Sequence, residues 1–420
     1  MLLTLPELQA LRTLTADGRL LMLTRVVRLL AYGCLSVVFA LYLAALGLTE
    51  QQIGLVLTLT LVGDAMLSLG IATVADRLGR RRMLILGAGL MVCAGLVFGV
   101  SSHLVLLLLA AFVGTMSPSG GEVGPFLSIE QAALPQTTTD EHRTQVFAWY
   151  NVMGSFATAL GALGGGALAQ VLQSAGSTPL DSYRGILLGY AGLGVLLGWL
   201  FTHLSPAVEA IPATSAPTQG RLGLHRSRPV ICKLSALFML DSFGGGLVVQ
   251  SLMAYWFHAR FGVEPALLGS LFFGANLFAG CSALAAARIA ARIGLINTMV
   301  CTHLPSNIFL MLVPLMPTLP LATIVLLLRF SLSQMDVPTR QSYTMAIVAP
   351  DERSAAAGIT SFARTVAHAG APLVTGALLN AGLWSTPFVL AGVLKSVYDL
   401  TLYGSFRAVK PPEEQPERTA

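Results

Sequence analysis

Long apolar segments recur along nearly the whole chain, and they constrain its fold more than any other feature. A helix needs about 20 apolar residues to cross the hydrocarbon core of a bilayer. By that length the sequence predicts twelve membrane-spanning helices, numbered here as spans 1 to 12: residues 21–46, 53–75, 83–101, 104–134, 144–173, 184–203, 230–259, 265–290, 296–316, 319–347, 354–380 and 385–405. Charged residues make up 11% of the 420 residues, too few for a soluble protein, which carries about 25%. We therefore predict an all-α integral membrane protein.

The basic residues are distributed very unevenly between the predicted loops. Of the 25 Lys and Arg, twenty lie on the side that holds the N-terminus, and two, Arg184 and Arg260, lie on the opposite side. Cytoplasmic loops of membrane proteins carry such an excess of Lys and Arg. The distribution predicts a multi-pass protein of the cell membrane, the inner or plasma membrane, with both termini in the cytoplasm. It also accounts for the net charge of +5 without nucleic acid as a partner.

The two halves of the chain repeat each other at an offset of about 210 residues. The loops after spans 4 and 10 read TDEHRTQ and PDERSAA, and both spans carry an acid shortly before a proline. Between the halves, residues 204–229 are rich in Pro, Ala, Thr and Gly, which is typical of a linker. We predict a six-helix bundle over residues 1–203, a cytoplasmic linker over 204–229 and a second six-helix bundle with a short tail over 230–420. Such parallel repeats occur in transporters.

The loop between spans 2 and 3 reads Asp76-Arg77-Leu78-Gly79-Arg80-Arg81. It resembles the signature of the major facilitator superfamily at this place, although Ala72 replaces the glycine that the family has four residues before the aspartate. The resemblance covers nearly all of the chain and implies two pseudo-symmetric six-helix bundles. Asp76 suits the N-terminal dipole of a neighbouring helix, and Arg77 and Arg80 suit carboxylates across the interface between the halves. We expect Asp76, Arg77, Gly79, Arg80 and Arg81 to form a conformational latch; the alternative is that the arginines only set the membrane orientation.

Span 5 carries a glycine-rich segment with Gly154, Gly161, Gly165 and Gly166 as its key positions. The segment resembles the glycine motif in the fifth helix of the superfamily's bacterial proton antiporters, with Ala162 where the family has proline. The resemblance implies export of a substrate in exchange for protons. The alternative is tight helix packing, because small residues bring membrane helices close together in any case.

Ionisable side chains inside predicted spans cost free energy in a bilayer and are therefore candidates for function. In members of the superfamily helices 1, 4, 7 and 10 line the cavity, which implies a substrate or proton site that includes Glu122, Glu130, Asp241, Arg329, Asp336 and Arg340. Asp64 in span 2 is a further candidate, either for coupling or for packing. Asp336 and Arg340 are four residues apart and can pair on one helix face. Asp241 and Glu122 have no such partner on their own helices, so we rank them above Asp336 as proton carriers.

Four charged residues of the predicted spans have structural interpretations. Lys395 and Asp399 are spaced to neutralise each other along span 12. Arg28 lies near the end of span 1, where it either extends toward the membrane surface or serves the site. Glu130 either serves the site or forms a loop contact with Arg143.

The sequence favours a secondary active transporter of a small molecule. The glycine runs at 164–166 and 244–246 lack the GK[ST] sequence of a phosphate-binding loop, so an ion gradient is the expected energy source, with no cofactor and no metal. Seven His scattered over separate spans and loops argue against an intramembrane enzyme, and a membrane sensor would need a longer soluble domain. Proton-coupled efflux is preferred, and uptake of a small nutrient is the alternative. The expected partners are the substrate, protons and the lipid bilayer, with the protein a monomer.

Overall fold

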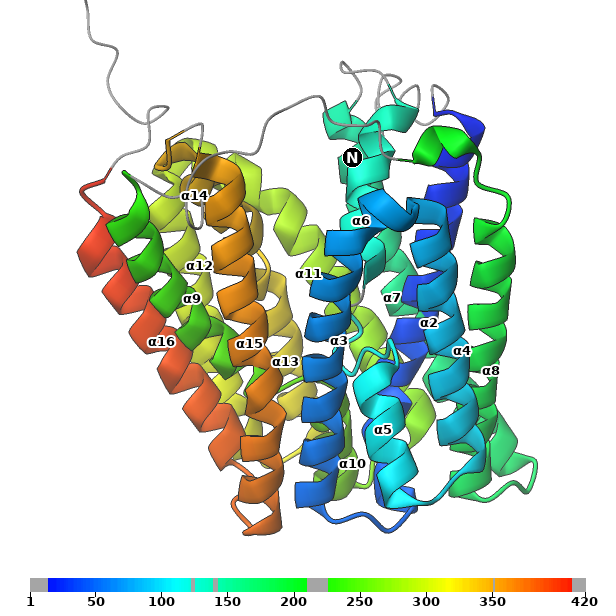
Figure 1. Ribbon diagram of the computed structural model, residues 1–420. Helices are drawn as coiled ribbons and strands as arrows, with labels where there is room; N and C mark the ends of the chain where they lie inside the picture. The colour runs from blue at the N-terminus through cyan, green and yellow to red at the C-terminus, as the bar shows by residue number, and fades with distance from the viewer. Residues whose placement is uncertain (1–13, 122–124, 139–142, 210–225, 350–351, 410–420) are drawn as a thin grey trace, which may run out of the picture. The chain divides into compact units, whose positions relative to one another are not determined.

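The computed structural model describes residues 14–121, 125–138, 143–209, 226–349 and 352–409. Within these ranges every regular element is a helix, as Figure 1 shows. Nine segments in them are long and apolar enough to cross a bilayer, and they match predicted spans 1–3 and 5–10. Spans 11 and 12 are single helices of 28 and 21 residues that carry ionisable residues, α15 (Arg353–Asn380) and α16 (Thr386–Phe406). The predicted all-α membrane fold is confirmed.

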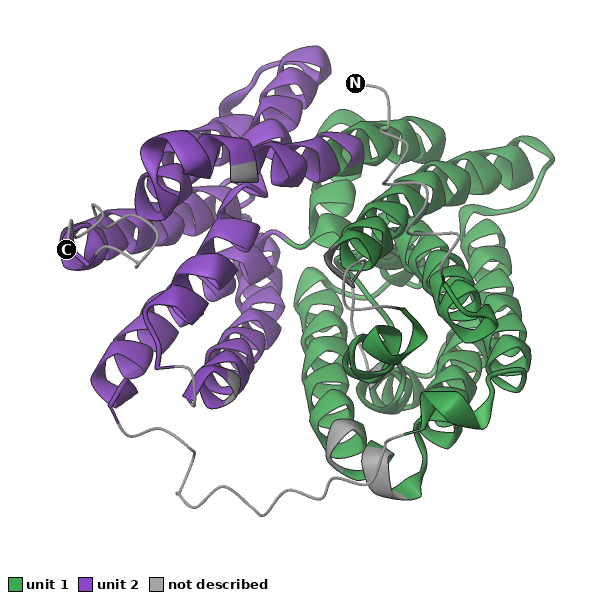
Figure 2. Ribbon diagram, turned by 90° about the horizontal axis from the view of Figure 1, so that it is seen from above, with its two compact units in different colours: residues 1–213, 249–276 green, residues 214–248, 277–420 purple. Residues whose placement is uncertain are grey.

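The helices group into two compact units, which Figure 2 colours separately. Unit 1 spans residues 1–213 and 249–276, and unit 2 spans 214–248 and 277–420. Unit 1 holds α2 (Ala16–Ala45), α3 (Glu50–Leu78), α4 (Arg80–Val100), α5 (Leu104–Val113), α6 (Pro125–Ala133), α7 (Arg143–Ser174), α8 (Pro179–Phe201), α10 (Gln250–Phe261) and the first part of α11 (Pro265–Ile293). Unit 2 holds α9 (Arg228–Leu247), the rest of α11, α12 (Leu295–Leu312), α13 (Leu319–Ser333), α14 (Asp336–Ala346), α15 and α16. Residues 249–276, which the sequence places in the second bundle, thus pack within unit 1.

Three predicted spans are each divided into two helices. Span 4 becomes α5 and α6, span 7 becomes α9 and α10, and span 10 becomes α13 and α14. Glycine and proline near two of the breaks weaken the helix: Pro118 and Gly120 in span 4, and Gly246 at the end of α9. Pro338 lies in the first turn of α14, where proline is tolerated because its position needs no donated hydrogen bond. The broken spans are three of the four that the family's fold would place around a cavity.

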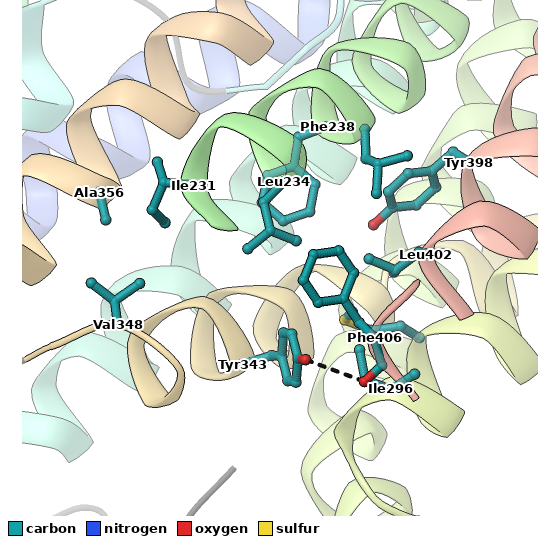
Figure 3. Close-up of a cluster of buried hydrophobic side chains, with 12 residues drawn as sticks. Ile231, Leu234, Phe238, Ile296, Tyr343, Val348, Ala356, Tyr398, Leu402 and Phe406 are labelled. Atoms are coloured by element: carbon teal, nitrogen blue, oxygen red, sulfur yellow. Dashed lines mark hydrogen bonds between the residues drawn. The ribbon is translucent and has the colours of Figure 1, made fainter. Parts of the chain in front are cut away.

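Unit 2 has a buried apolar cluster that holds its helices together, drawn in Figure 3. Side chains of α9, α12, α14, α15 and α16 contribute to it, and the Tyr343 hydroxyl donates to the Phe406 carbonyl oxygen at 3.4 Å. Two members also reach polar groups. The Tyr398 ring meets the His303 ring edge-on at 6.0 Å between centroids, and the Phe238 ring lies 5.4 Å from the Arg340 guanidinium carbon. The cluster therefore positions the helices that carry the charged residues of unit 2.

Candidate functional site

The signature loop between α3 and α4 is held by a carboxylate from the segment after α8. Gly79 has a φ of 101°, a left-handed conformation that favours glycine, and α4 starts directly after it. The Glu209 carboxylate accepts from the backbone N–H of Arg80 at 2.5 Å and of Arg81 at 3.3 Å. The Arg81 side chain donates to the Thr202 carbonyl oxygen at 2.6 Å. Glu209 therefore caps the positive end of α4.

Arg80, one of the two arginines that the sequence pairs with carboxylates across the halves, makes backbone contacts within unit 1. Arg80 is buried, and its Nη1 donates to the carbonyl oxygens of Ala132 at 3.4 Å and Val208 at 3.3 Å. These bonds join the start of α4 to the end of α6 and to the chain that leads into the linker. The side chains of Asp76 and Arg77 lie outside the described residues. Glu209 and three backbone carbonyl groups are partners of this loop that sequence reasoning did not identify, and the latch itself stays a prediction.

Replacing Glu209 with alanine is expected to lower the free energy of unfolding by about 1–2 kcal/mol, because two N–H groups at the start of α4 lose their acceptor. Thermal unfolding of the detergent-purified protein measures the loss. Glu264→Ala removes an exposed acid in the loop before α11 and is the matched control. It should unfold at the same temperature as the wild type. Equal unfolding of both variants would show that the cap contributes nothing.

The glycines of span 5 form the close contact of α7 with its neighbours in unit 1. A Cβ on Gly161 would lie 2.1 Å from the Leu30 carbonyl oxygen, and one on Gly165 would lie 2.7 Å from a Cα of α2. A Cβ on Gly154 would lie 2.6 Å from a side chain of α2, and one on Gly166 would lie 2.2 Å from a carbonyl oxygen at the start of α11. The close atoms at Gly161, Gly165 and Gly166 belong to the backbone, so a side chain at these positions requires a backbone shift. At Gly154 they belong to flexible side chains, which can move aside. The glycine motif therefore provides tight helix packing, whatever else it does.

A buried ion pair fixes the second half of span 4 to span 1. The Arg28 guanidinium on α2 donates to both carboxylate oxygens of Glu130 on α6, at 2.7 Å each. The Tyr150 hydroxyl on α7 donates to the same carboxylate at 2.5 Å. Arg28 is fully buried, so the expectation that it extends to the membrane surface is wrong. For Glu130 the structure supplies Arg28 as partner, and the Arg143 side chain lies outside the described residues.

A larger charged network lies in unit 2 and is centred on Asp241 of α9. Lys395 Nζ on α16 lies 2.6 Å from Asp241 Oδ1, and Arg340 Nη1 on α14 lies 3.1 Å from Asp241 Oδ2. The same Arg340 nitrogen lies 2.8 Å from Asp336 Oδ2, which confirms the predicted pair within span 10. All four side chains are buried. Asp241 thus has two cationic partners on other helices, which the search along its own helix did not find.

The network continues through residues that sequence reasoning missed. His303 Nδ1 on α12 lies 3.0 Å from Asp399 Oδ1, and the Asn307 side chain donates to Asp399 Oδ2 at 2.8 Å. The predicted pair of Lys395 with Asp399 is wrong, because Lys395 binds Asp241 and Asp399 binds α12. A signal was present: two polar pairs with a four-residue spacing, in apolar spans 9 and 12. Side chains with that spacing share a helix face, and each face turns toward the other helix.

The two ion pairs occupy related places in the repeat, with the charges reversed. Glu130 and Arg340 are separated by the repeat offset of about 210 residues and lie on the second halves of broken spans. Their partners Arg28 and Asp241 lie on the first helix of each half. In both units an ion pair therefore fixes the second half of the broken span to the first helix, a contact that can hold or release that half.

Three further candidates have different surroundings. Arg329 lies on the face of α13 that also carries the buried Leu326 and Ser333. Its Nε and Nη1 are buried and find no hydrogen-bond acceptor among the residues that the structure describes. Asp64 is buried on α3 within unit 1. Glu122 lies outside the described residues. The structure thus gathers Asp241, Asp336 and Arg340 in unit 2 and leaves Asp64 and Glu130 in unit 1.

Comparisons with known proteins agree with this architecture. A model of the Major Facilitator Superfamily matches residues 21–368. Uncharacterized membrane protein YJR124C of Saccharomyces cerevisiae is 31% identical, over 94% of each chain. Similar solved structures include the nucleoside transporter NupG (TM-score 0.70, 14% identity, 93% of this chain and 99% of that one). A bacterial homolog of the human lysosomal transporter Spinster (0.68, 15%, 92% and 95%) and the human organic anion transporter MFSD10 (0.63, 17%, 92% and 100%) share the fold. The chain belongs to the Major Facilitator Superfamily and is a membrane transporter of a small substrate.

Proposed function

We propose that the protein exports a small molecule by alternating access and that proton entry drives the export. The observation that carries the proposal is the buried network of Asp241, Arg340, Asp336 and Lys395 in unit 2. Burying charges costs several kcal/mol per ion, which their mutual attraction offsets only with good geometry. Such a network is therefore uncommon unless its partners serve a function. It joins two of the broken helices, so a change of charge beside it alters helix contacts.

Export is preferred over uptake because the glycine segment of span 5 resembles the motif of proton antiporters. A strain that lacks the protein should become hypersensitive to one class in a panel of toxic cationic, neutral and anionic compounds. In proteoliposomes, an imposed pH gradient should drive transport of that class. Asp241→Asn should abolish gradient-driven transport, and the Glu264→Gln variant should retain it. Normal resistance of the deletion strain, with no gradient-driven flux of any compound, would overturn the proposal.

Uptake of a small nutrient with an anionic group is the second candidate, and Arg329 favours it. Its buried guanidinium nitrogens without a described acceptor suit a carboxylate or phosphate on a substrate, because a guanidinium binds such groups through paired hydrogen bonds. Arg329→Gln should then abolish uptake of a labelled anionic nutrient, and Arg329→Lys should retain part of it. Hypersensitivity to toxic compounds without an uptake defect in the deletion strain would exclude this candidate.

Impermeant labelling tests the proposed orientation, with both termini in the cytoplasm. Arg82→Cys, an exposed site at the start of α4, should stay unlabelled by a thiol reagent applied outside the cell. His103→Cys, exposed at the other end of α4, should be labelled. Both variants are made in a chain whose five native cysteines are replaced with alanine. The reverse labelling pattern would invert the topology.

A further inference from the structure

His303 lies halfway along α12, a helix that neither the sequence nor the family's cavity helices brought into the site. Its two ring nitrogens face two different carboxylates. Nδ1 lies 3.0 Å from Asp399 Oδ1 on α16, and Nε2 lies 3.7 Å from Asp241 Oδ1 on α9. His303 is 4% exposed. The imidazole therefore connects Asp399 to the Asp241 network.

The acids of that network are poor candidates for a group that changes charge. Asp241 has Lys395 at 2.6 Å and Arg340 at 3.1 Å, and Asp336 shares Arg340 at 2.8 Å. Both carboxylates already bind cationic side chains, so a proton would have to displace one of these partners. Arginine itself stays protonated throughout. Histidine is the side chain whose charge ordinarily changes near neutral pH.

The groups around the imidazole come from three other helices. They are Asp241 on α9, Asp336 and Arg340 on α14, and Lys395, Tyr398 and Asp399 on α16. Arg364 and His368 on α15 also lie near Asp241, and His368 Nδ1 lies 3.1 Å from the Ser242 carbonyl oxygen. Asp399 and Asp241 thus face the two ring nitrogens, with Asp336 and the Lys395 ammonium nearby, so an added positive charge on His303 has acceptors on both sides.

We propose that His303 carries the coupling proton, with Asp399 and Asp241 as its two hydrogen-bond acceptors; the inference rests on the proposed proton coupling. A carboxylate only accepts, so in the neutral ring Nδ1 carries the hydrogen and donates it to Asp399. A proton taken up at Nε2 creates a second N–H, which points at Asp241 Oδ1. Lys395 binds that same oxygen. The imidazolium competes with the ammonium for it and repels it, and loss of the proton restores the present contact.

Protonation of His303 is expected to weaken the contact between α9 and α16. Lys395 is the ionic link from α16 to Asp241, and Asp241 lies shortly before the break that ends α9 at Leu247. When His303 is protonated, Asp241 exchanges its contact with Lys395 on α16 for a contact with His303 on α12. The packing of α9 against its neighbouring helices then changes. This exchange gives the proton a direct mechanical effect on one of the broken spans.

The test uses protons alone, because no substrate is needed to load the imidazole. The full chain is reconstituted in liposomes on a solid-supported membrane, and the pH is stepped from about 7.5 to about 6. The wild type should give a transient charge displacement, and His303→Asn should reduce it at least about tenfold, to the level of protein-free liposomes. His258→Asn, at an exposed histidine of α10, is the matched control and should keep the signal. An undiminished signal in His303→Asn overturns the proposal.

A second measurement covers the case in which the His303 variants do not fold. Ring-¹⁵N spectra of wild-type protein labelled at its seven histidines should show a solvent-protected ring that binds a proton in this pH range. Spectra in which only exposed rings titrate overturn the proposal. These outcomes distinguish the role of His303 from the proposed function. If His303→Asn still exports substrate along a pH gradient, His303 is not the proton carrier, while proton-coupled export stands. If His303→Asn loses the proton signal but the wild type transports equally well without a pH gradient, His303 binds a proton and the proposal of coupled export is wrong.

Discussion

Replacing Glu130 with alanine is expected to lower the free energy of unfolding by about 3–5 kcal/mol, the range for removing one partner of a buried ion pair. The Arg28 and Glu130 side chains are both 0% exposed, and the carboxylate binds both terminal nitrogens of the guanidinium. Loss of the Glu130 carboxylate also leaves the Tyr150 hydroxyl without the acceptor of this hydrogen bond. Chemical denaturation of the detergent-purified protein measures the loss.

The double variant Arg28→Met with Glu130→Leu separates charge from packing. Both charges leave together, so most of the lost stability should return, because no unpaired charge stays buried. Glu130→Gln retains the shape of the side chain and should fall between the wild type and Glu130→Ala. A double variant as unstable as the single one would show that α6 depends on the pair itself for its position and not on the balance of charge.

The helices of this fold could be predicted because they follow from length and apolar composition alone. A segment that must satisfy its own backbone in lipid has almost no choice but helix, so spans 1–3 and 5–10 match the described helices closely. The break in span 4 falls at Pro118 and Gly120, residue types that weaken a helix. The break after Gly246 in span 7 was not predicted, because three glycines in an apolar span are equally compatible with close packing.

The partners of the charged residues could not be predicted in the same way. Spacing along one helix correctly paired Asp336 with Arg340, and it wrongly paired Lys395 with Asp399. Both pairs are four residues apart, so spacing gives the two the same weight. What distinguishes them is the neighbouring helix: α12 presents His303 to Asp399, and α9 presents Asp241 to Lys395. The four-residue spacing within each helix indicates a shared polar face, but it does not say which other helix, about a hundred or more residues away, that face contacts.

Two glycines of the span 5 segment allow a matched pair of alanine substitutions with opposite expected effects on stability. Gly161→Ala is expected to destabilise the protein by about 3 kcal/mol, at the upper end for overpacking, since the new Cβ would lie 2.1 Å from the Leu30 carbonyl oxygen. A side chain could rotate away from the contact, but a backbone carbonyl cannot, so α2 and α7 must separate. Gly164→Ala lies three residues along the same helix with nothing within 4 Å of its Cβ. It should instead stabilise α7 by up to about 1 kcal/mol through higher helix propensity.

Thermal unfolding of the two variants and the wild type should show stability changes of opposite sign. Transport measurements then test whether the glycine motif serves packing alone or also helix movement. If Gly161 serves packing alone, a Gly161→Ala protein that is kept folded at low temperature should transport at the wild-type rate. If α2 instead slides along α7 during the transport cycle, the wider spacing between the two helices in Gly161→Ala should slow transport even when the protein is folded. Equal stability of Gly161→Ala and Gly164→Ala would contradict both, because it would mean that the helices are not in contact at Gly161 as the structure places them.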